Sequence, residues 1–496
     1  MNHISKFYIT VAIDYPNTLP HIGHVYEKLT ADTIARWQRL CGKNVFFLLG
    51  TDEHGLKIET AAKKAKLSPK DFVDEKAKQY KQTYAQWNFS FDRFIRTTDP
   101  GHEKVSQAIF KKVFDKKLIF TGEYEGFYCI DCEFFYLEKD LVNGNCPVHG
   151  TKCELLKEEN YFFKMSLFQK QIISHIQKNP EFIQPKTKRN EVLSRLEQPL
   201  RDLSVSRASL KWGIPLPNDS SHVIYVWFDA LLNYLSGIDY PNKKFKEFWP
   251  ADIQLIGKDI QWHHCVIWPS ILFAAEIKLP KTIFVHGFVN DEKGEKLSKS
   301  KGNAIDLNQL AKKYQIDSIR YFLLREIMFG DDGNFSEKKL IERNNNELAN
   351  ELGNLLNRVL TLIEKNCAGK IPSGKADKQL IEALKLKEIQ NSMNLYELNK
   401  AIGLIFEFIS SQNKFVNEKK VWELKAKEQE NALYSLADSL RVTAILLEPF
   451  IPETSAKILQ QLGIAKQKIS LNECKFNLLK SGTKIQKKDI LFKKIV

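Results

Sequence analysis

Strand-like and helix-like patterns alternate in the first 50 residues. Residues 6–13 form a continuous run of mainly β-branched and aromatic side chains, which predicts a buried strand. After a loop with Pro16 and Pro20, apolar residues recur at helical spacing from about Ile22 to Leu40. A second apolar run at 45–49 follows and leads into the polar segment 50–55. Strand, helix and strand in this order predict an α/β fold with a doubly wound parallel sheet, and ligands at the strand carboxyl ends.

The pattern changes twice further along the chain. A cysteine-rich segment around 120–160 interrupts the alternation, and we interpret it as an insertion. Strand-like runs at 223–228, 253–256 and 282–285 would then complete the sheet. After about residue 340 strand patterns nearly vanish, and apolar residues follow the helical period at Leu348, Leu352, Leu355, Leu356, Val359, Leu360 and Ile363. The second half is therefore predicted to be an all-α domain.

Charge and composition narrow the class of partner. The chain of 496 residues has 74 Lys and Arg against 60 Asp and Glu, a net charge of +14 that favours nucleic acid or an anionic membrane surface. A basic C-terminal tail, 463–496, carries nine of the lysines, as either a solvated surface or a phosphate-facing patch. No apolar run is long enough to span a membrane and no signal-peptide pattern begins the chain, so we expect a cytoplasmic protein.

Four of the eight cysteines lie close together and predict a metal site. Cys129-x2-Cys132 and Cys146-x2-His149 are two pairs separated by a short loop, the arrangement of a tetrahedral structural zinc site. Cys153 competes with His149 for the fourth position, but the repeated x2 spacing favours His149. We expect one zinc ion per chain, which organises the insertion and takes no part in the reaction.

Two polar motifs suit a phosphate. His21 and His24 flank Gly23 at the start of the first predicted helix, where free N–H groups and the helix dipole favour an anion. Two neutral imidazole donors there would stabilise a phosphoryl group whose charge grows in the transition state. Far along the chain, Lys296 and Lys299 are spaced by three in a polar, glycine-flanked loop that could wrap a triphosphate.

Together these motifs resemble the two signature motifs of class I aminoacyl-tRNA synthetases, which activate an amino acid with ATP and load it onto tRNA. The resemblance narrows to the methionyl-tRNA synthetases and extends over most of the chain, through residues 12–16, 50–55, 225–230, 257–260 and 286–288. It implies that methionine attacks the α-phosphate of ATP with Mg²⁺, and that His21, His24, Lys296 and Lys299 are catalytic. The ATP-binding residues that it implies are His21, Gly23, His24, Asp259, Lys296, Ser298 and Lys299.

The resemblance also implies a methionine pocket, built from Ile13, Tyr15, Asp52, Trp227, Ala230, Tyr234, Ile260 and His264. An unbranched thioether suits aromatic and aliphatic surroundings, and Asp52 would pair with the substrate ammonium. The chain departs from the common family pattern at Leu297, where methionine is usual, and at Asp14, where an apolar or aromatic residue is frequent.

In the helical half, the family reads the anticodon at the positions of Asn354, Arg358 and Trp422. An exposed Trp can stack on an unpaired base, while Asn and Arg can read its edges. Val421 replaces the proline that usually precedes this tryptophan. The alternative for Trp422 is a core residue of the helical bundle.

The predicted domain order follows. It comprises a Rossmann-type catalytic domain in two halves (1–115 and 216–290), a connective insertion with the zinc knuckle (116–215), a lysine-motif and stem-contact region (291–343), a helical anticodon-binding domain (344–462) and the basic tail (463–496). The expected partners are ATP, L-methionine and both initiator and elongator methionine tRNA. Because the chain ends soon after the helices, without the additional C-terminal dimerisation domain of some relatives, we expect a monomer.

Two other functions compete with this hypothesis. A class I synthetase for leucine, isoleucine or valine would usually carry a large editing insertion, and one for cysteine would need zinc in the pocket. A tRNA-binding protein without catalysis is the rival of a different class. The intact histidine and lysine motifs argue against it.

Overall fold

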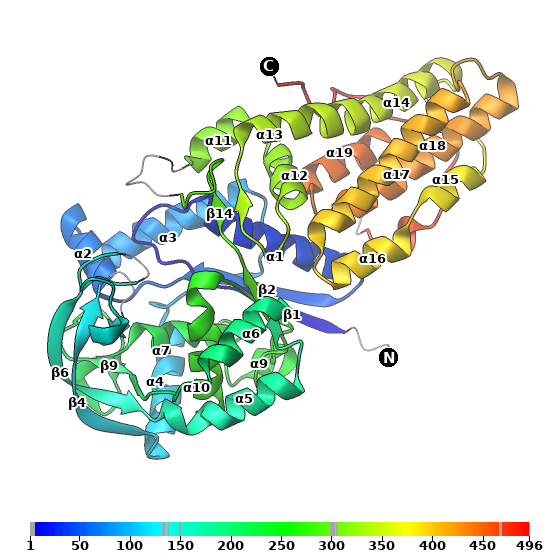
Figure 1. Ribbon diagram of the computed structural model, residues 1–496. Coiled ribbons are helices and arrows are strands. Elements are labelled where there is room, and N and C mark those ends of the chain that lie inside the picture. Colours follow the sequence, from blue (N-terminus) through cyan, green and yellow to red (C-terminus); the bar gives the residue numbers. More distant parts are fainter. Residues whose placement is uncertain are drawn as a thin grey trace. The chain divides into compact units, whose positions relative to one another are not determined.

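The computed structural model describes residues 5–130, 134–136, 138–147, 150–297, 303, 305–465 and 469–495 (Figure 1). The chain divides into two compact units. The sheet unit consists of Lys6–Pro20 and Phe46–His286, and the helical unit consists mainly of His21–Val45 and Gly287–Val496. The first crossover helix, α1 (Ile22–Leu40), belongs to the helical unit by its contacts.

The centre of the sheet unit is a six-stranded sheet with the strand order β3-β2-β1-β12-β13-β7. The pairs β2–β3, β1–β12, β12–β13 and β13–β7 are parallel. The strands are β1 (Lys6–Val11), β2 (Asn44–Thr51), β3 (Arg93–Arg96), β12 (Ile253–Gly257), β13 (Ile283–His286) and β7 (Ile183–Gln184). The chain runs outward in one direction from β1 and in the other from β12, so the topological switch point lies between these two strands. The predicted doubly wound α/β fold is confirmed.

Helices and two large apolar clusters surround this sheet. The α-helices of the unit are α2 (Leu56–Ala65), α3 (Pro69–Gln86), α4 (Pro100–Asp115), α5 (Gln169–Lys178), α6 (Lys186–Arg195), α7 (Val226–Leu231), α8 (Asn233–Ser236), α9 (Lys243–Phe248) and α10 (Trp268–Ala274). The unit also has the short 3₁₀ helices η1 (Glu138–Asp140), η2 (Met165–Phe168) and η3 (Lys258–Ile260) and the short π-helix η4 (His263–Ile267). The larger cluster joins α4, α7 and α10 to Ile283 and Val285 of β13. The smaller one joins Tyr8, Phe46 and Leu48 to α9.

The insertion predicted from the cysteine-rich segment is an antiparallel sheet with the order β5-β4-β6-β8. Its strands are β4 (Ile119–Cys129), β5 (Phe134–Tyr136), β6 (Glu154–Phe163) and β8 (Leu203–Ser204). Between β6 and β8 the chain returns to the parallel sheet, where the two-residue strand β7 pairs with β13. A strand of two residues has too little pattern to be recognised in the sequence.

The prediction of a sheet strand at 223–228 is wrong. Residues 219–224 form β11, which lies in a separate sheet with the order β10-β11-β9, together with β9 (Ser206–Arg207) and β10 (Pro215–Leu216). The chain then turns into helix α7. The aromatic and β-branched side chains of this run favour a strand by propensity, but burial of Phe228, Ala230 and Leu231 in the core selects a helix.

The helical unit confirms the predicted all-α second half. Besides α1 it contains α11 (Leu307–Lys313), α12 (Ile316–Glu326), α13 (Glu337–Arg343), α14 (Asn354–Asn366), α15 (Lys378–Ala383), α16 (Leu386–Asn394), α17 (Leu398–Glu418), α18 (Ala426–Leu447), α19 (Pro452–Gln461) and the short turn η6 (Leu471–Cys474), with one small strand pair, β14 (Val289–Asn290) and β15 (Gly333–Asn334). Helix α18 packs against α14, α17 and α19 (Figure 1). All seven apolar residues of the predicted stripe from Leu348 to Ile363 are buried.

One detail of that stripe differs from an ordinary helix. Residues Asn344–Gly353 form a π-helix, η5, between α13 and α14. A π-helix has i→i+5 hydrogen bonds, so side chains in it do not keep the 3.6-residue spacing that the sequence pattern assumed. No helix in the described parts of the chain is long and apolar enough to cross a membrane.

Candidate active site

Three of the predicted site residues follow strands of the parallel sheet at or beside its topological switch point. Tyr15 follows β1, Asp52 follows β2, and Asp259 lies in η3 directly after β12. A Cβ atom on Gly257 would lie only 2.7 Å from Oδ1 of Asp259, so the glycine makes room for this carboxylate. In open α/β sheets the carboxyl edge at the switch point is the usual ligand site.

Aromatic side chains adjoin this edge. The rings of Tyr15 and Trp227 and the side chain of Ile260 pack against the large apolar cluster that contains Tyr234. The hydroxyl of Tyr234 lies 2.7 Å from Nε2 of His264, whose Nδ1 lies 3.1 Å from the carbonyl oxygen of Ile260. The surroundings are therefore aromatic and aliphatic with a few fixed polar atoms, as expected for a small apolar side chain.

Other predicted methionine-site residues fit this region less directly. Ile13 packs against the smaller cluster around Tyr8, not against the one that holds Tyr234. Asp52 is mostly buried, and its backbone N–H donates to the carbonyl of Asp14 at 2.8 Å. The carboxylate of Asp14 is buried and accepts a hydrogen bond from Tyr84 of α3, so this departure from the family pattern is anchored within the fold.

The structure brings the two motif histidines together at the start of α1. Their rings stack with centroids 3.7 Å apart. Nδ1 of His21 accepts from the backbone N–H of Gly23 at 3.1 Å and of His24 at 3.4 Å, and Nδ1 of His24 accepts from the N–H of His21 at 3.3 Å. The histidines thus cap the helix reciprocally, and the Gly23 and His24 amides expected to face an anion already bond to a side chain.

This capping fixes the tautomer of both rings. A ring nitrogen that accepts a hydrogen bond carries no hydrogen, so each neutral imidazole has its proton on Nε2. Burial, together with repulsion from the Lys28 ammonium, lowers the pKa of His24 to about 3, which keeps its ring neutral at pH 7. A Cβ atom on Gly23 would lie 3.0 Å from Cε1 of His21, so the glycine lets the capping ring fold back.

The lysine loop begins with a tight turn. The carboxylate of Asp291 accepts from the backbone N–H of Lys293 at 3.0 Å and of Glu295 at 2.8 Å, and from the amide of Asn303 at 2.8 Å. The Asn303 amide, with these backbone donors, lowers the pKa of Asp291. Lys296 follows this turn, with Nζ 5.2 Å from the centroid of the Phe288 ring. Ser298 and Lys299 lie outside the described residues.

Three thiols of the insertion lie together. Cys129, Cys146 and Cys153 form a buried cluster. Burial and the neighbouring Cys129 and Cys146 raise the pKa of Cys153 to about 11. The other two predicted zinc ligands, Cys132 and His149, lie outside the described residues, and the described part of the chain alone contains no group of three acidic, Cys or His side chains arranged to hold a metal. Thiolates held this close together repel one another, and a zinc ion bound between them would remove that repulsion, so the cluster suits zinc.

In the helical unit, two of the three predicted anticodon residues are in contact. The guanidinium of Arg358 lies 4.7 Å from the ring centroid of Trp422, and its Nη1 donates to Oδ1 of Asn417 at 2.7 Å. Trp422 is 45% exposed, whereas the adjacent Val421 is fully buried. The alternative that Trp422 belongs to the bundle core is therefore wrong. Asn354 is exposed at the first residue of α14.

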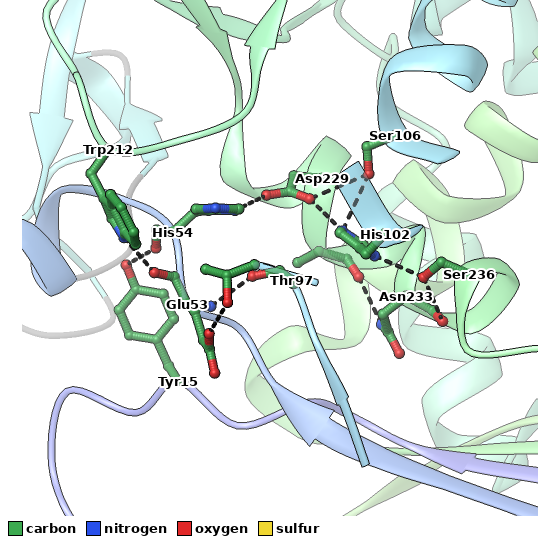
Figure 2. A network of polar contacts seen from close by, with 12 residues as sticks. Tyr15, Glu53, His54, Thr97, His102, Ser106, Trp212, Asp229, Asn233 and Ser236 are labelled. Atoms are coloured by element: carbon green, nitrogen blue, oxygen red, sulfur yellow. Dashed lines mark hydrogen bonds and ion pairs between the residues drawn. The ribbon is translucent and has the colours of Figure 1, made fainter. Parts of the chain in front are cut away.

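A polar network that the sequence did not reveal lies in the sheet unit. The buried carboxylate of Asp229 on α7 bonds to both His54 and His102 (Figure 2). Residues 50–55 and 225–230 were recognised as family segments, but no residue pattern connects either of them to His102. Such a connection depends on tertiary packing alone.

Comparison with known proteins identifies the family. Residues 7–152 and 136–360 match the model of tRNA synthetases class I (M), and residues 368–496 match the anticodon binding domain of methionyl tRNA ligase. The chain belongs to the class I methionine tRNA synthetases. The predicted family and enzyme class are thereby confirmed.

Individual relatives are similar in sequence to this synthetase over nearly its whole length. The methionine–tRNA ligase of Rickettsia prowazekii is 41% identical over 99% of each chain. That of Caldanaerobacter subterraneus is 43% identical over 99% of this chain and 79% of its own. Among solved structures, Mycobacterium tuberculosis methionyl-tRNA synthetase in complex with methionyl-adenylate has a TM-score of 0.94 and 37% identity, covering 98% of this chain and 99% of that one.

Proposed function

We propose that this synthetase attaches L-methionine to its tRNA in two steps, and so supports both initiation and elongation of translation. The observation that carries the proposal is the match, over 98% of the chain, to a synthetase solved with methionyl-adenylate. In the first step the methionine carboxylate attacks the α-phosphate of ATP, and pyrophosphate leaves. In the second, a ribose hydroxyl of the terminal tRNA adenosine attacks the adenylate carbonyl, and AMP leaves.

The methionine is bound in the sheet unit. Tyr15, Trp227, Ala230, Tyr234, Ile260 and His264, with Ile13, surround the thioether, and Asp52 accepts from the ammonium group. The bond between Tyr234 and His264 and the packing of three of these side chains against one cluster support this assignment. A carboxylate in mostly buried surroundings is the natural partner of a desolvated ammonium group.

The reacting phosphates are stabilised by the two motifs. His21 and His24, next to Gly23, donate from Nε2 to the α-phosphate, and Lys296 and Lys299, with Ser298, bind the departing pyrophosphate. Asp259 accepts from the ATP ribose hydroxyls. The Nδ1 acceptor bonds of both histidines support this role, because they leave the donor proton on Nε2 in each neutral ring. Mg²⁺ accompanies ATP and neutralises part of the phosphate charge.

A structural zinc ion is held by Cys129, Cys132, Cys146 and His149. The gathering of Cys129 and Cys146 in one buried cluster supports the site, and the presence of Cys153 in that cluster makes it the competing fourth ligand. Thiolate ligands closed around the metal would fold the insertion and leave no position for a substrate.

The tRNA is recognised by Asn354, Arg358 and Trp422, which read the anticodon. The exposed Trp422 ring and its neighbouring guanidinium support base stacking. We also propose that the chain has the domain division predicted from its sequence. The enzyme is monomeric and works in the cytoplasm, where tRNA is charged.

Amino-acid-dependent exchange of pyrophosphate into ATP tests the function. Each of the twenty amino acids is supplied in turn, without tRNA. We expect exchange with methionine and at most weak exchange with the others. Exchange that is fastest with leucine, isoleucine, valine or cysteine would assign a different synthetase, and none with any amino acid would indicate a tRNA-binding protein without catalysis.

A further inference from the structure

Asp229 holds two imidazoles with one buried carboxylate. Its Oδ2 lies 2.7 Å from Nδ1 of His54, and its Oδ1 lies 2.6 Å from Nε2 of His102 (Figure 2). Asp229 and His102 are fully buried and His54 nearly so. A buried carboxylate costs free energy unless donors satisfy it, so these two N–H groups are needed for Asp229 to be ionised inside the fold.

The bonds of this carboxylate fix both tautomers. The two imidazole donors lower the pKa of Asp229 to about 2 in spite of its burial, so that its oxygens only accept hydrogen bonds. His54 must then carry a proton on Nδ1 and His102 on Nε2. The remaining Nδ1 of His102 lies 2.8 Å from the hydroxyl oxygen of Ser236 on α8. One carboxylate on α7 therefore connects the loop after β2 to α4 and, through His102, to α8.

The loop after β2 is held on its other sides by backbone contacts. The hydroxyl of Tyr15 donates to the carbonyl of His54 at 2.7 Å, and the indole N–H of Trp212 donates to the carbonyl of Glu53 at 2.6 Å. The backbone N–H of Glu53 donates to the hydroxyl of Thr97 at 2.8 Å. In Figure 2 the contacts of Tyr15 and Trp212 lie on one side of the His54 ring and Asp229 lies on the other. The His54 side chain bonds this loop to α7.

Both elements that Asp229 joins carry residues of the proposed methionine site. Asp52 lies two residues before His54, and Trp227 and Ala230 lie on either side of Asp229 on α7. We propose that Asp229 is a positioning residue for methionine binding, which acts through His54 to hold Asp52 in register with Trp227. This inference rests on the proposed function. Asp229 itself touches no substrate, and its effect is on the geometry of groups that do.

Asp229→Asn tests the inference with little change of shape. An amide has one acceptor oxygen and one donor nitrogen, so it cannot accept from both imidazoles in their present tautomers. In methionine-dependent pyrophosphate exchange we expect the KM for methionine to rise about 10- to 100-fold, the scale for a small misplacement of binding groups. The kcat and the KM for ATP should change less than about threefold, because the ATP-binding groups stay in place.

Coupling to Asp52 separates positioning from general stabilisation. If Asp229 acts through Asp52, Asp229→Asn should add little to the methionine KM of an Asp52→Asn enzyme, since the group it positions has already been removed. A matched control is Asp438→Asn in the helical unit. Donors reach both oxygens of this buried carboxylate, since Nε of Arg441 donates to Oδ1 at 2.7 Å and the backbone N–H of Asn477 donates to Oδ2. Asp438→Asn should lower the melting temperature without raising the methionine KM.

A pair of His54 variants decides the question even if Asp229→Asn does not fold. The amide nitrogen of Asn lies near the position of histidine Nδ1, and that of Gln lies near Nε2. His54→Asn should therefore keep the bond to Asp229 and a methionine KM near the normal value, whereas His54→Gln should raise it about 10-fold or more.

Three results would overturn the inference. They are a folded Asp229→Asn enzyme with a normal methionine KM, equal KM increases for ATP and methionine, and equal effects of the two His54 variants. Failure of the wild-type enzyme to exchange with methionine would instead overturn the proposed function, and this inference with it.

Discussion

The two histidines at the start of α1 differ from ordinary surface histidines because backbone N–H groups donate to both Nδ1 atoms. If they stabilise the α-phosphate, only Nε2 can supply the donor. His24→Gln places an amide nitrogen near Nε2, whereas His24→Asn does not. We expect adenylate formation at saturating methionine and ATP to slow about 10²–10³-fold in the Asn variant, and much less in the Gln variant. Equal rates in rapid-quench measurements of the two variants would contradict the role of Nε2.

The surroundings of His263 predict that the stability of the fold depends on pH. Its ring stacks on Trp227 with centroids 3.7 Å apart, and burial, with the nearby His264 and Arg195, lowers its pKa from 6.5 to about 3. Between these two pKa values the unfolded chain binds a proton that the folded protein does not. The free energy of unfolding therefore falls as the pH drops below 6.5, and this contribution of His263 to stability is fully present above pH 6.5.

His263→Phe removes this titration and keeps an aromatic ring over Trp227. The loss of unfolding free energy between pH 7 and pH 5 should shrink by up to about 2 kcal/mol relative to the wild type. Urea unfolding at both pH values measures the difference. The same loss in both proteins would mean that His263 is not buried in its neutral form.

Local motifs allowed the sequence to predict the element on which some candidate site residues lie. His21, Gly23 and His24 occur within four positions, and their helix start was recognisable from the pattern. It could not predict that His21 would cap its own helix, because that depends on the ring folding back over Gly23. Nor could it connect Asp229 to His102, 127 positions away, since only packing of α4 against α7 and α8 brings them together.

At the scale of elements, the insertion makes the clearest prediction. Cys129 and Cys146 lie in one buried cluster with Cys153, and purified, reduced protein should contain about one zinc ion per chain. Cys146→Ala should lose most of it, because a missing ligand opens the closed coordination shell. Elemental analysis measures the metal content.

Cys153→Ala serves as the control in the same cluster. If His149 is the fourth ligand, this variant should keep its zinc. Loss of zinc equal to that of Cys146→Ala would make Cys153 the ligand, and wild-type protein without any zinc would refute the site altogether.

Whether a segment forms a helix or a strand was predictable where a run of several apolar positions showed which side chains are buried. Strands β1, β2, β12 and β13 and the leucine stripe agree with expectation because each run contains several buried apolar residues. The run 223–228 became β11 and α7 because aromatic side chains suit either element, and core packing chose between them. The π-helix η5 was not predictable, since its hydrogen-bond pattern leaves no distinct sequence signal.

At the scale of the whole molecule, the residues proposed to read the anticodon and those proposed to bind methionine lie in different units of the chain. Trp422 lies in the helical unit, and the proposed methionine pocket lies in the sheet unit. Trp422→Ala should leave pyrophosphate exchange nearly unchanged. It should lower charging of methionine tRNA about 5- to 150-fold, the cost of one lost stacked base at about 1–3 kcal/mol. Because the ring is 45% exposed, the melting temperature should change little.

The control for Trp422→Ala is a tRNA with an altered anticodon. The charging defect should shrink on that tRNA, since the missing contact is no longer made even in the wild type. An equal loss on both tRNAs, or a large drop in melting temperature, would show that Trp422 does not read the anticodon.

The central claim is that one chain carries out the complete ligation of methionine to its tRNA. Labelled methionine incubated with the purified protein, ATP, Mg²⁺ and methionine tRNA tests it most directly, by acid precipitation of the tRNA. We predict that label accumulates on the tRNA only when ATP and Mg²⁺ are present, is released by mild alkali as expected of an aminoacyl ester, and does not accumulate with leucine, isoleucine or valine in place of methionine. Absence of alkali-labile methionine on the tRNA, or faster charging with another amino acid, would contradict the account.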